Sequence, residues 1–143
     1  MNDLLIEHPS GYMLIHMDNF FPCTLSKFKM VLKTIKMAWS HEEELIEQLK
    51  DYFNERLEEI ELMCDSYSKD YYEYTQKRAD TERLIEKRKH PNGVPLSEYE
   101  MSEAKRNLSE YKRIERESLN DLKRCRKDKE YFKKYLRQLG VKE

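Results

Sequence analysis

Glycine and proline are scarce in this sequence, which contains three glycines and four prolines in 143 residues. A loop that cradles phosphate groups needs several glycines, because its backbone must approach the phosphates closely. The sequence also lacks a GxSxG motif and any cysteine–histidine arrangement typical of nucleophilic enzymes. We therefore expect a protein without enzymatic activity and without a bound cofactor.

Cysteine and histidine are also few, with three cysteines and four histidines in the chain. Cys23, Cys64 and Cys125 have no CxxC spacing and cannot all pair, which favours free thiols in a reducing, cytoplasmic setting. The stretch that begins at His41 resembles the zinc motif HExxH, but Leu45 stands where that motif has its second histidine. We therefore expect no metal site.

Long apolar runs are absent, and no apolar segment approaches the ~18 residues that would span a membrane. The first residues show no basic segment followed by an apolar one, so we expect no secretory leader. The formal net charge is −1, which argues against general binding to nucleic acids or to membrane surfaces. These features predict a soluble, cytoplasmic protein.

Charged residues make up 38% of the chain and are interspersed with apolar residues over one long stretch. From Ser40 to His90 there is neither glycine nor proline, which predicts a helix about 75 Å long at ~1.5 Å per residue. Ser40 and Glu43 have the spacing of a capping box, and the basic run Lys87–Lys89 suits the negative end of the helix dipole. A helix of this length is typical of a coiled coil.

A tight turn at residues 90–96 and a second long helix are expected next. The turn contains Asn-Gly between two prolines, and Ser97 with Glu100 has capping-box spacing before a helix to about Leu139. If the turn is centred near residues 92–93, facing residues of an antiparallel hairpin have numbers that sum to about 185. Seven apolar pairs then meet across the seam: Ile46–Leu139, Leu49–Leu136, Phe53–Phe132, Ile60–Cys125, Met63–Leu122, Tyr74–Tyr111 and Leu84–Met101.

The N-terminal part of the sequence predicts a small α+β head at residues 1–39. Apolar segments at residues 4–7 and 12–17 flank a turn that contains Pro9 and Gly11, which is typical of a β-hairpin. Two strands alone are marginally stable in water, so the hairpin needs an apolar surface to lie on.

A short helix is expected from Thr24 or Ser26 to Trp39, with Phe28 and Trp39 as apolar anchors of the head. The residues expected to receive the head lie outside the seam of the long helices: Leu45, Tyr52, Leu62, Tyr131 and Tyr135. The predicted fold class is mainly α. The head packs at the base of an antiparallel coiled-coil hairpin formed by residues 40–143.

Charge is distributed unevenly between the two long helices. Residues 40–66 contain ten acidic and two basic residues, whereas residues 120–143 contain nine basic and four acidic ones. We call the acidic side chains that are expected to point outward the acidic surface: Glu47, Asp51, Glu55, Glu58, Glu61 and Asp65. We call their basic counterparts the basic surface: Lys123, Arg124, Lys127, Lys134 and Arg137.

These patterns predict a protein-interaction module that presents a helical surface to a macromolecular partner. The favoured hypothesis is an inhibitor or accessory protein of a phage or other mobile element, whose acidic surface mimics nucleic-acid phosphates and blocks a nucleic-acid-handling enzyme. A competing hypothesis is direct nucleic-acid binding by the basic surface, with Tyr131, Phe132 and Tyr135 stacking bases. A third is a structural homo-oligomer, rather than a monomer, formed through apolar surface near Tyr72.

Overall fold

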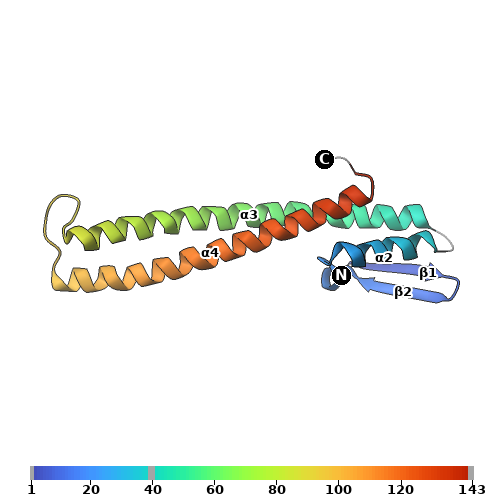
Figure 1. The fold of residues 1–143 in the computed structure, drawn as a ribbon, viewed down its shortest axis with the longest axis horizontal. Helices are drawn as coiled ribbons and strands as arrows, with labels where there is room; N and C mark the ends of the chain where they lie inside the picture. Colours follow the sequence, from blue (N-terminus) through green and yellow to red (C-terminus); the bar gives the residue numbers. More distant parts are fainter. Residues whose placement is uncertain (1, 39–40, 142–143) are drawn as a thin grey trace. The chain divides into compact units, whose positions relative to one another are not determined.

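The computed structural model describes residues 2–38 and 41–141, which are mainly helical (Figure 1). In chain order the elements are β1 (Asp3–His8), β2 (Gly11–His16), α1 (Met17–Phe20), α2 (Leu25–Lys36), α3 (Glu42–Lys87) and α4 (Glu98–Gln138). The predicted fold class is confirmed, because an antiparallel two-stranded hairpin and short helices precede two long helices packed against each other. The predicted anchor Trp39 and the capping box at Ser40 lie outside the described residues and stay predictions.

The chain divides into two compact units. Unit 1 comprises Met1–Leu62 and Arg126–Glu143, and unit 2 comprises Met63–Cys125. Both α3 and α4 run through the boundary, so each unit contains a part of each long helix. The predicted domain division between residues 39 and 40 falls at residues outside the described ones and stays a prediction.

The β-hairpin of unit 1 has the predicted turn at Pro9 and Ser10, and Gly11 at the start of β2 has a positive φ of 141°. Its buried face carries Leu4 opposite Ile15, both at most 5% exposed. The second strand ends at His16, one residue earlier than predicted. Met17 is already the first residue of α1, and its N–H donates to the Asn2 carbonyl at 2.9 Å. The residues between the hairpin and α2 are therefore partly helical.

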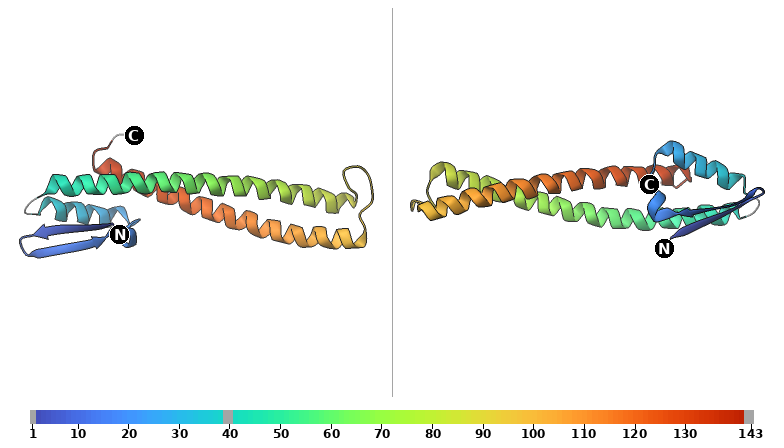
Figure 2. Two further views of the ribbon diagram at one scale, coloured as in Figure 1. Left: turned by 180° about the vertical axis from the view of Figure 1, so that it is seen from behind. Right: turned by 90° about the horizontal axis from the view of Figure 1, so that it is seen from below.

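The second helix, α2, begins as predicted and ends earlier. The Thr24 hydroxyl accepts a hydrogen bond from the Lys27 N–H at 3.4 Å, which caps the helix. Phe28, Val31 and Ile35 are buried at a helical spacing and form one apolar face, and the burial of the predicted anchor Phe28 is confirmed. Figures 1 and 2 show the β-hairpin, α2 and the first turns of α3 gathered together in unit 1.

An aromatic cluster forms the centre of unit 1. Its rings are Phe21, Phe28, Phe53, Phe132 and Tyr135, and their centroids lie 4.7–6.0 Å apart in the contacting pairs. All five side chains are buried, and large aromatic rings contribute much of the apolar area that a small core removes from water. The predicted contact of Phe53 with Phe132 is confirmed at 5.8 Å between centroids.

The prediction that Leu62 helps to receive the head is wrong. Leu45, Tyr52 and Tyr135 are buried as expected, and Tyr131 is half-buried, but Leu62 is 71% exposed. At 3.6 residues per turn, Leu62 is rotated by about 100° around α3 from Leu45, so it cannot share the same buried stripe. The apolar surface of α3 that receives the head therefore does not include Leu62.

Unit 2 consists of the remaining turns of α3 and α4 with the loop between them. The predicted pair Tyr74–Tyr111 is confirmed, with ring centroids 5.9 Å apart. Next to it, the Arg78 guanidinium donates to the Glu115 carboxylate at 2.7 Å and to Glu82 at 3.0 Å. Polar contacts thus accompany apolar ones across this part of the helix pair.

The loop between α3 and α4 is held by its own hydrogen bonds. The N–H of His90 donates to the Val94 carbonyl at 2.7 Å, and the N–H of Leu96 donates to the Arg88 carbonyl at 3.0 Å. The helix α3 ends three residues earlier than predicted, because Arg88 adopts a left-handed conformation with φ of 54°. The capping box at Ser97 is confirmed by reciprocal hydrogen bonds with Glu100 of 3.1 and 3.2 Å.

Candidate interaction surfaces

The acidic surface consists of exposed side chains that all lie on α3. They are separated by three or four residues, a spacing that keeps successive side chains on one side of a helix. All of them belong to unit 1 except Asp65, which belongs to unit 2. The first four, from Glu47 to Glu58, lie along three turns of a single rigid element.

Few cations neutralise the acidic surface. Glu47 lies 3.5 Å from the Lys50 ammonium, and Glu61 lies 3.6 Å from that of Lys129 on α4. In the part of the chain that the structure describes, no basic side chain lies within ion-pair distance of Asp51, Glu55 or Glu58.

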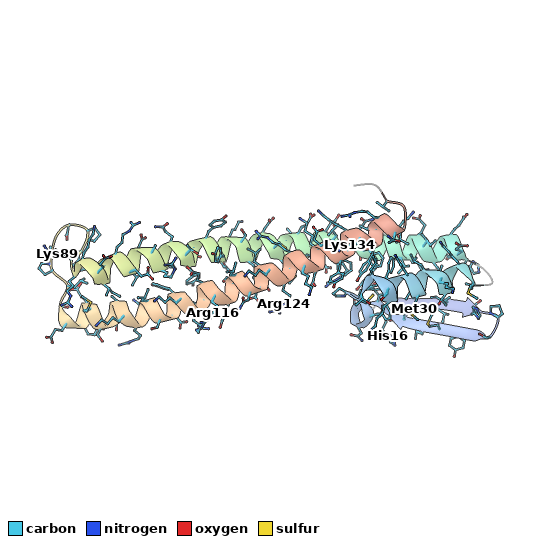
Figure 3. The ribbon with its side chains drawn as sticks, in the orientation of Figure 1. His16, Met30, Lys89, Arg116, Arg124 and Lys134 are labelled. Carbon is cyan, nitrogen blue, oxygen red and sulfur yellow. The ribbon has the colours of Figure 1, made fainter. Side chains whose placement is uncertain are left out.

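The basic surface is also exposed along α4. Lys123 and Arg124 belong to unit 2, and the other three residues belong to unit 1. The Arg124 guanidinium lies 3.2 Å from Asp121 one turn away, and Figure 3 shows its side chain on the outside of α4. Sequence patterning therefore placed both charged surfaces correctly with respect to solvent.

The aromatic residues expected to stack nucleic-acid bases are not available for that role. Phe132 and Tyr135 are fully buried in the aromatic cluster of unit 1, and Tyr131 is half-buried against Tyr135. The Tyr135 hydroxyl accepts a hydrogen bond from the Cys23 N–H at 2.7 Å. Burial therefore excludes base stacking by Phe132 and Tyr135, and the rest of the nucleic-acid hypothesis stays a prediction.

Two buried tyrosines are held in their protonated form. Burial raises the pKa of Tyr52, and its hydrogen bond to Asp18 at 2.9 Å adds to the shift. Burial likewise raises the pKa of Tyr135. Both hydroxyls therefore act as hydrogen-bond donors in the core of unit 1 across the physiological pH range.

Residues 2–38 and 41–141 contain no cluster of three or more histidine, cysteine, aspartate or glutamate side chains that could hold a metal ion. Within the same residues, none of the three cysteines is in a disulfide. No helix of the described chain combines the length and the apolar character needed to cross a bilayer.

A hollow beside the loop of unit 2 is a feature that the sequence patterns did not predict. We call it the loop cavity; it has a volume of about 840 Å³ and is lined by Asp80, Arg83, Leu84, Lys87, Lys89, His90, Pro91 and Gly93. The basic run Lys87–Lys89 was the signal in the sequence that could have indicated this site. Basic residues are also common at the end of a helix, where they stabilise its dipole, so the run alone does not predict a cavity. The position of its side chains around a cavity depends on how the loop turns after Arg88.

Comparisons of this chain with protein-family models, with curated proteins and with solved structures found no match. The chain's own surfaces therefore carry any inference about its function. The candidates are the acidic surface, the basic surface and the loop cavity.

Proposed function

We propose that the protein is a non-enzymatic interaction module whose acidic surface binds a basic surface of a macromolecular partner. The observation that carries this proposal is the exposure of Asp51, Glu55 and Glu58 without a cation partner in the described chain. Carboxylates that lack internal partners raise the negative potential around them and attract positively charged surfaces over about one Debye length.

The arrangement of the carboxylates favours a partner with an extended basic groove. Successive acidic side chains four residues apart stand about 6 Å apart along a helix that rises ~1.5 Å per residue. A row of negative charges on a rigid helix resembles a nucleic-acid backbone in charge, and it can occupy a groove built for phosphates. The partner class that fits this chemistry is a nucleic-acid-handling protein, which the module would block.

We further propose a cytoplasmic inhibitor or accessory protein of a phage or other mobile element. The three thiols, none of which is in a disulfide among the described residues, support a reducing setting. A blocking role needs only a stable surface of the right charge, and the exposed acids of α3 offer such a surface.

Affinity purification from the native host tests the proposal. The variant carries Asp51→Lys, Glu55→Lys and Glu58→Lys, and the matched control carries Asp70→Lys and Glu86→Lys, two exposed acids of unit 2. We expect one specific protein to be recovered by the wild type and the control, with at least tenfold less recovered by the triple variant. Circular dichroism confirms that each variant folds.

The binding measured with the purified partner should weaken steeply as salt is raised, because the contact is electrostatic. Equal recovery by the triple variant would place the interface elsewhere and overturn the proposal.

Direct nucleic-acid binding is the second candidate, and the exposure of Lys127 and Lys134 favours it. It predicts a salt-dependent mobility shift with DNA or RNA that is lost in the double variant Lys127→Glu and Lys134→Glu. The absence of any shift at low salt would remove this candidate.

Homo-oligomerisation is the third candidate. Tyr72 is 70% exposed in unit 2, and apolar side chains of this size commonly cover each other in stable interfaces. Light scattering distinguishes the cases, since a monomer mass at high concentration would exclude it.

A further inference from the structure

The loop cavity of unit 2 has the size of a ligand-binding site. Its volume of about 840 Å³ falls within the range of 300–1,000 Å³ that is common for such sites. The end of α3 supplies Arg83, Leu84 and Lys87, and the loop supplies Lys89, His90 and Pro91. Figure 3 labels Lys89 in this loop.

The lining carries an excess of positive charge. Arg83, Lys87 and Lys89 are cationic, whereas Asp80 is the acidic member of the lining and lies 4.0 Å from Arg83. Neither Lys87 nor Lys89 has a carboxylate within ion-pair distance among residues 2–38 and 41–141. The two ammonium groups are therefore available to an anionic ligand.

The lining also includes apolar surface. Leu84 and Pro91 lie in it, and the one ring among the lining side chains is the imidazole of His90, which lies 2.5 Å from the Glu100 carboxylate. Two of the neighbouring backbone donors are already used, because the N–H of Gly93 donates to the His90 carbonyl at 2.9 Å and that of His90 donates to the Val94 carbonyl at 2.7 Å. Recognition in this cavity therefore rests on cationic and apolar side chains rather than on backbone amides.

These features favour one class of ligand over another. A nucleic-acid strand would pair its phosphates with the lysines. Its bases would find a single ring in the lining, the His90 imidazole that pairs with Glu100, and the strand would leave Leu84 and Pro91 without apolar contacts. A protein segment that combines carboxylates with aliphatic side chains would use both parts of the lining. Charge and apolar complementarity thus point to the same kind of partner.

We propose that the loop cavity binds an acidic, aliphatic segment of a protein partner. Carboxylates of the segment pair with Lys87, Lys89 and Arg83, and an aliphatic side chain packs on Leu84 and Pro91. This surface has the opposite charge to the acidic surface, and the proposal does not depend on the function proposed for that surface.

A displayed library of random peptides, panned on the full-length protein, tests the proposal. We expect enriched peptides that contain both acidic and aliphatic residues. The tightest of them, synthesised with a fluorescent label, should bind at least tenfold more weakly to the variant Lys87→Glu with Lys89→Glu. The control Lys69→Glu removes an exposed lysine of α3 that lies outside the cavity, and it should bind like the wild type.

A second variant, Lys87→Met with Lys89→Met, keeps the aliphatic stems and should also lose most of the binding. Circular dichroism checks that both variants fold. The proposal is overturned if no acidic peptide is enriched, or if the enriched peptides bind both double variants like the wild type. It is also overturned if a labelled single-stranded oligonucleotide, and no peptide, binds in a manner that requires Lys87 and Lys89.

Discussion

The hydroxyl of Tyr135 on α4 accepts a hydrogen bond from the backbone N–H of Cys23 at 2.7 Å and donates one to the carbonyl of the same residue. These two residues are 112 positions apart in the chain. One side-chain oxygen thus satisfies both backbone groups of a residue that precedes α2. It links the N-terminal elements of unit 1 to the last turns of α4.

Replacing Tyr135 by phenylalanine should lower the free energy of unfolding by about 1–3 kcal/mol, because the two backbone groups of Cys23 lose their partner. Urea denaturation followed by circular dichroism measures the change. Tyr131→Phe is the matched control, since its half-buried hydroxyl makes no hydrogen bond recorded within the described residues. Equal stability of the two variants would show that the link to Cys23 contributes nothing.

Truncation of Phe53 should be much more damaging. This side chain is 0% exposed and contacts rings from α2 and α4, so Phe53→Ala should cost about 3–5 kcal/mol through lost burial and the remaining cavity. Leu62→Ala on the same helix removes a side chain that is 71% exposed and should change stability by less than ~0.5 kcal/mol. Comparable losses in the thermal unfolding of the two variants would contradict the assigned core.

Removing the hydroxyl of Thr75 should increase the free energy of unfolding. The Thr75 hydroxyl is buried and has no hydrogen-bond partner among residues 2–38 and 41–141, so Thr75→Val replaces an unsatisfied polar group by a methyl group of similar shape. We expect a gain of about 1 kcal/mol in the free energy of unfolding, measured by chemical denaturation. Thr81→Val on the same helix serves as the comparison and should be nearly neutral. A loss of stability in Thr75→Val would mean that this hydroxyl has a partner in solution.

The capping box at the start of α4 should make stability depend on pH. The hydrogen bond from the Ser97 backbone N–H lowers the pKa of Glu100, and the Ser97 hydroxyl and His90 act in the same direction. A lowered pKa means that folding favours the carboxylate. Its contribution is complete above the ordinary glutamate value of about 4.3 and is lost as pH falls through the lower value of the folded state.

Glu100→Gln keeps an acceptor for the Ser97 N–H but removes this titration. The melting temperature of the wild type should therefore fall more than that of Glu100→Gln between pH 6 and pH 3. Glu98→Gln, in the same turn, provides the comparison and should follow the wild type. Parallel curves for all three proteins would rule out a contribution from the Glu100 charge.

The long helices and their pairing follow closely from local rules. The stretches that form α3 and α4 lack internal glycine and proline, and a single turn between them fixes the register. Phe53–Phe132 and Tyr74–Tyr111 could therefore be predicted from one assumed turn centre. The exposure of the acidic surface follows in the same way, because helical spacing decides which side a residue occupies.

Other features depend on tertiary contacts that periodicity does not encode. A helical wheel already turns Leu62 away from Leu45, but it does not show which elements cover Leu45 and Tyr52. The left-handed residue Arg88 ends α3 before any sequence break, and the path of the following loop creates the cavity. The Tyr135 hydroxyl, similarly, finds its partner only when distant parts of the chain meet.

Unit 1 is built from the two ends of the chain, and this has a consequence for its biosynthesis. Phe28 and Phe53 leave the ribosome well before Phe132 and Tyr135, which complete the same aromatic cluster. About 80 residues separate Phe53 from Phe132, so at ~5–20 residues per second the nascent core waits roughly 4–16 s for its last rings. The N-terminal elements therefore emerge with an incomplete apolar surface, and chaperones that shield nascent chains have that interval in which to act.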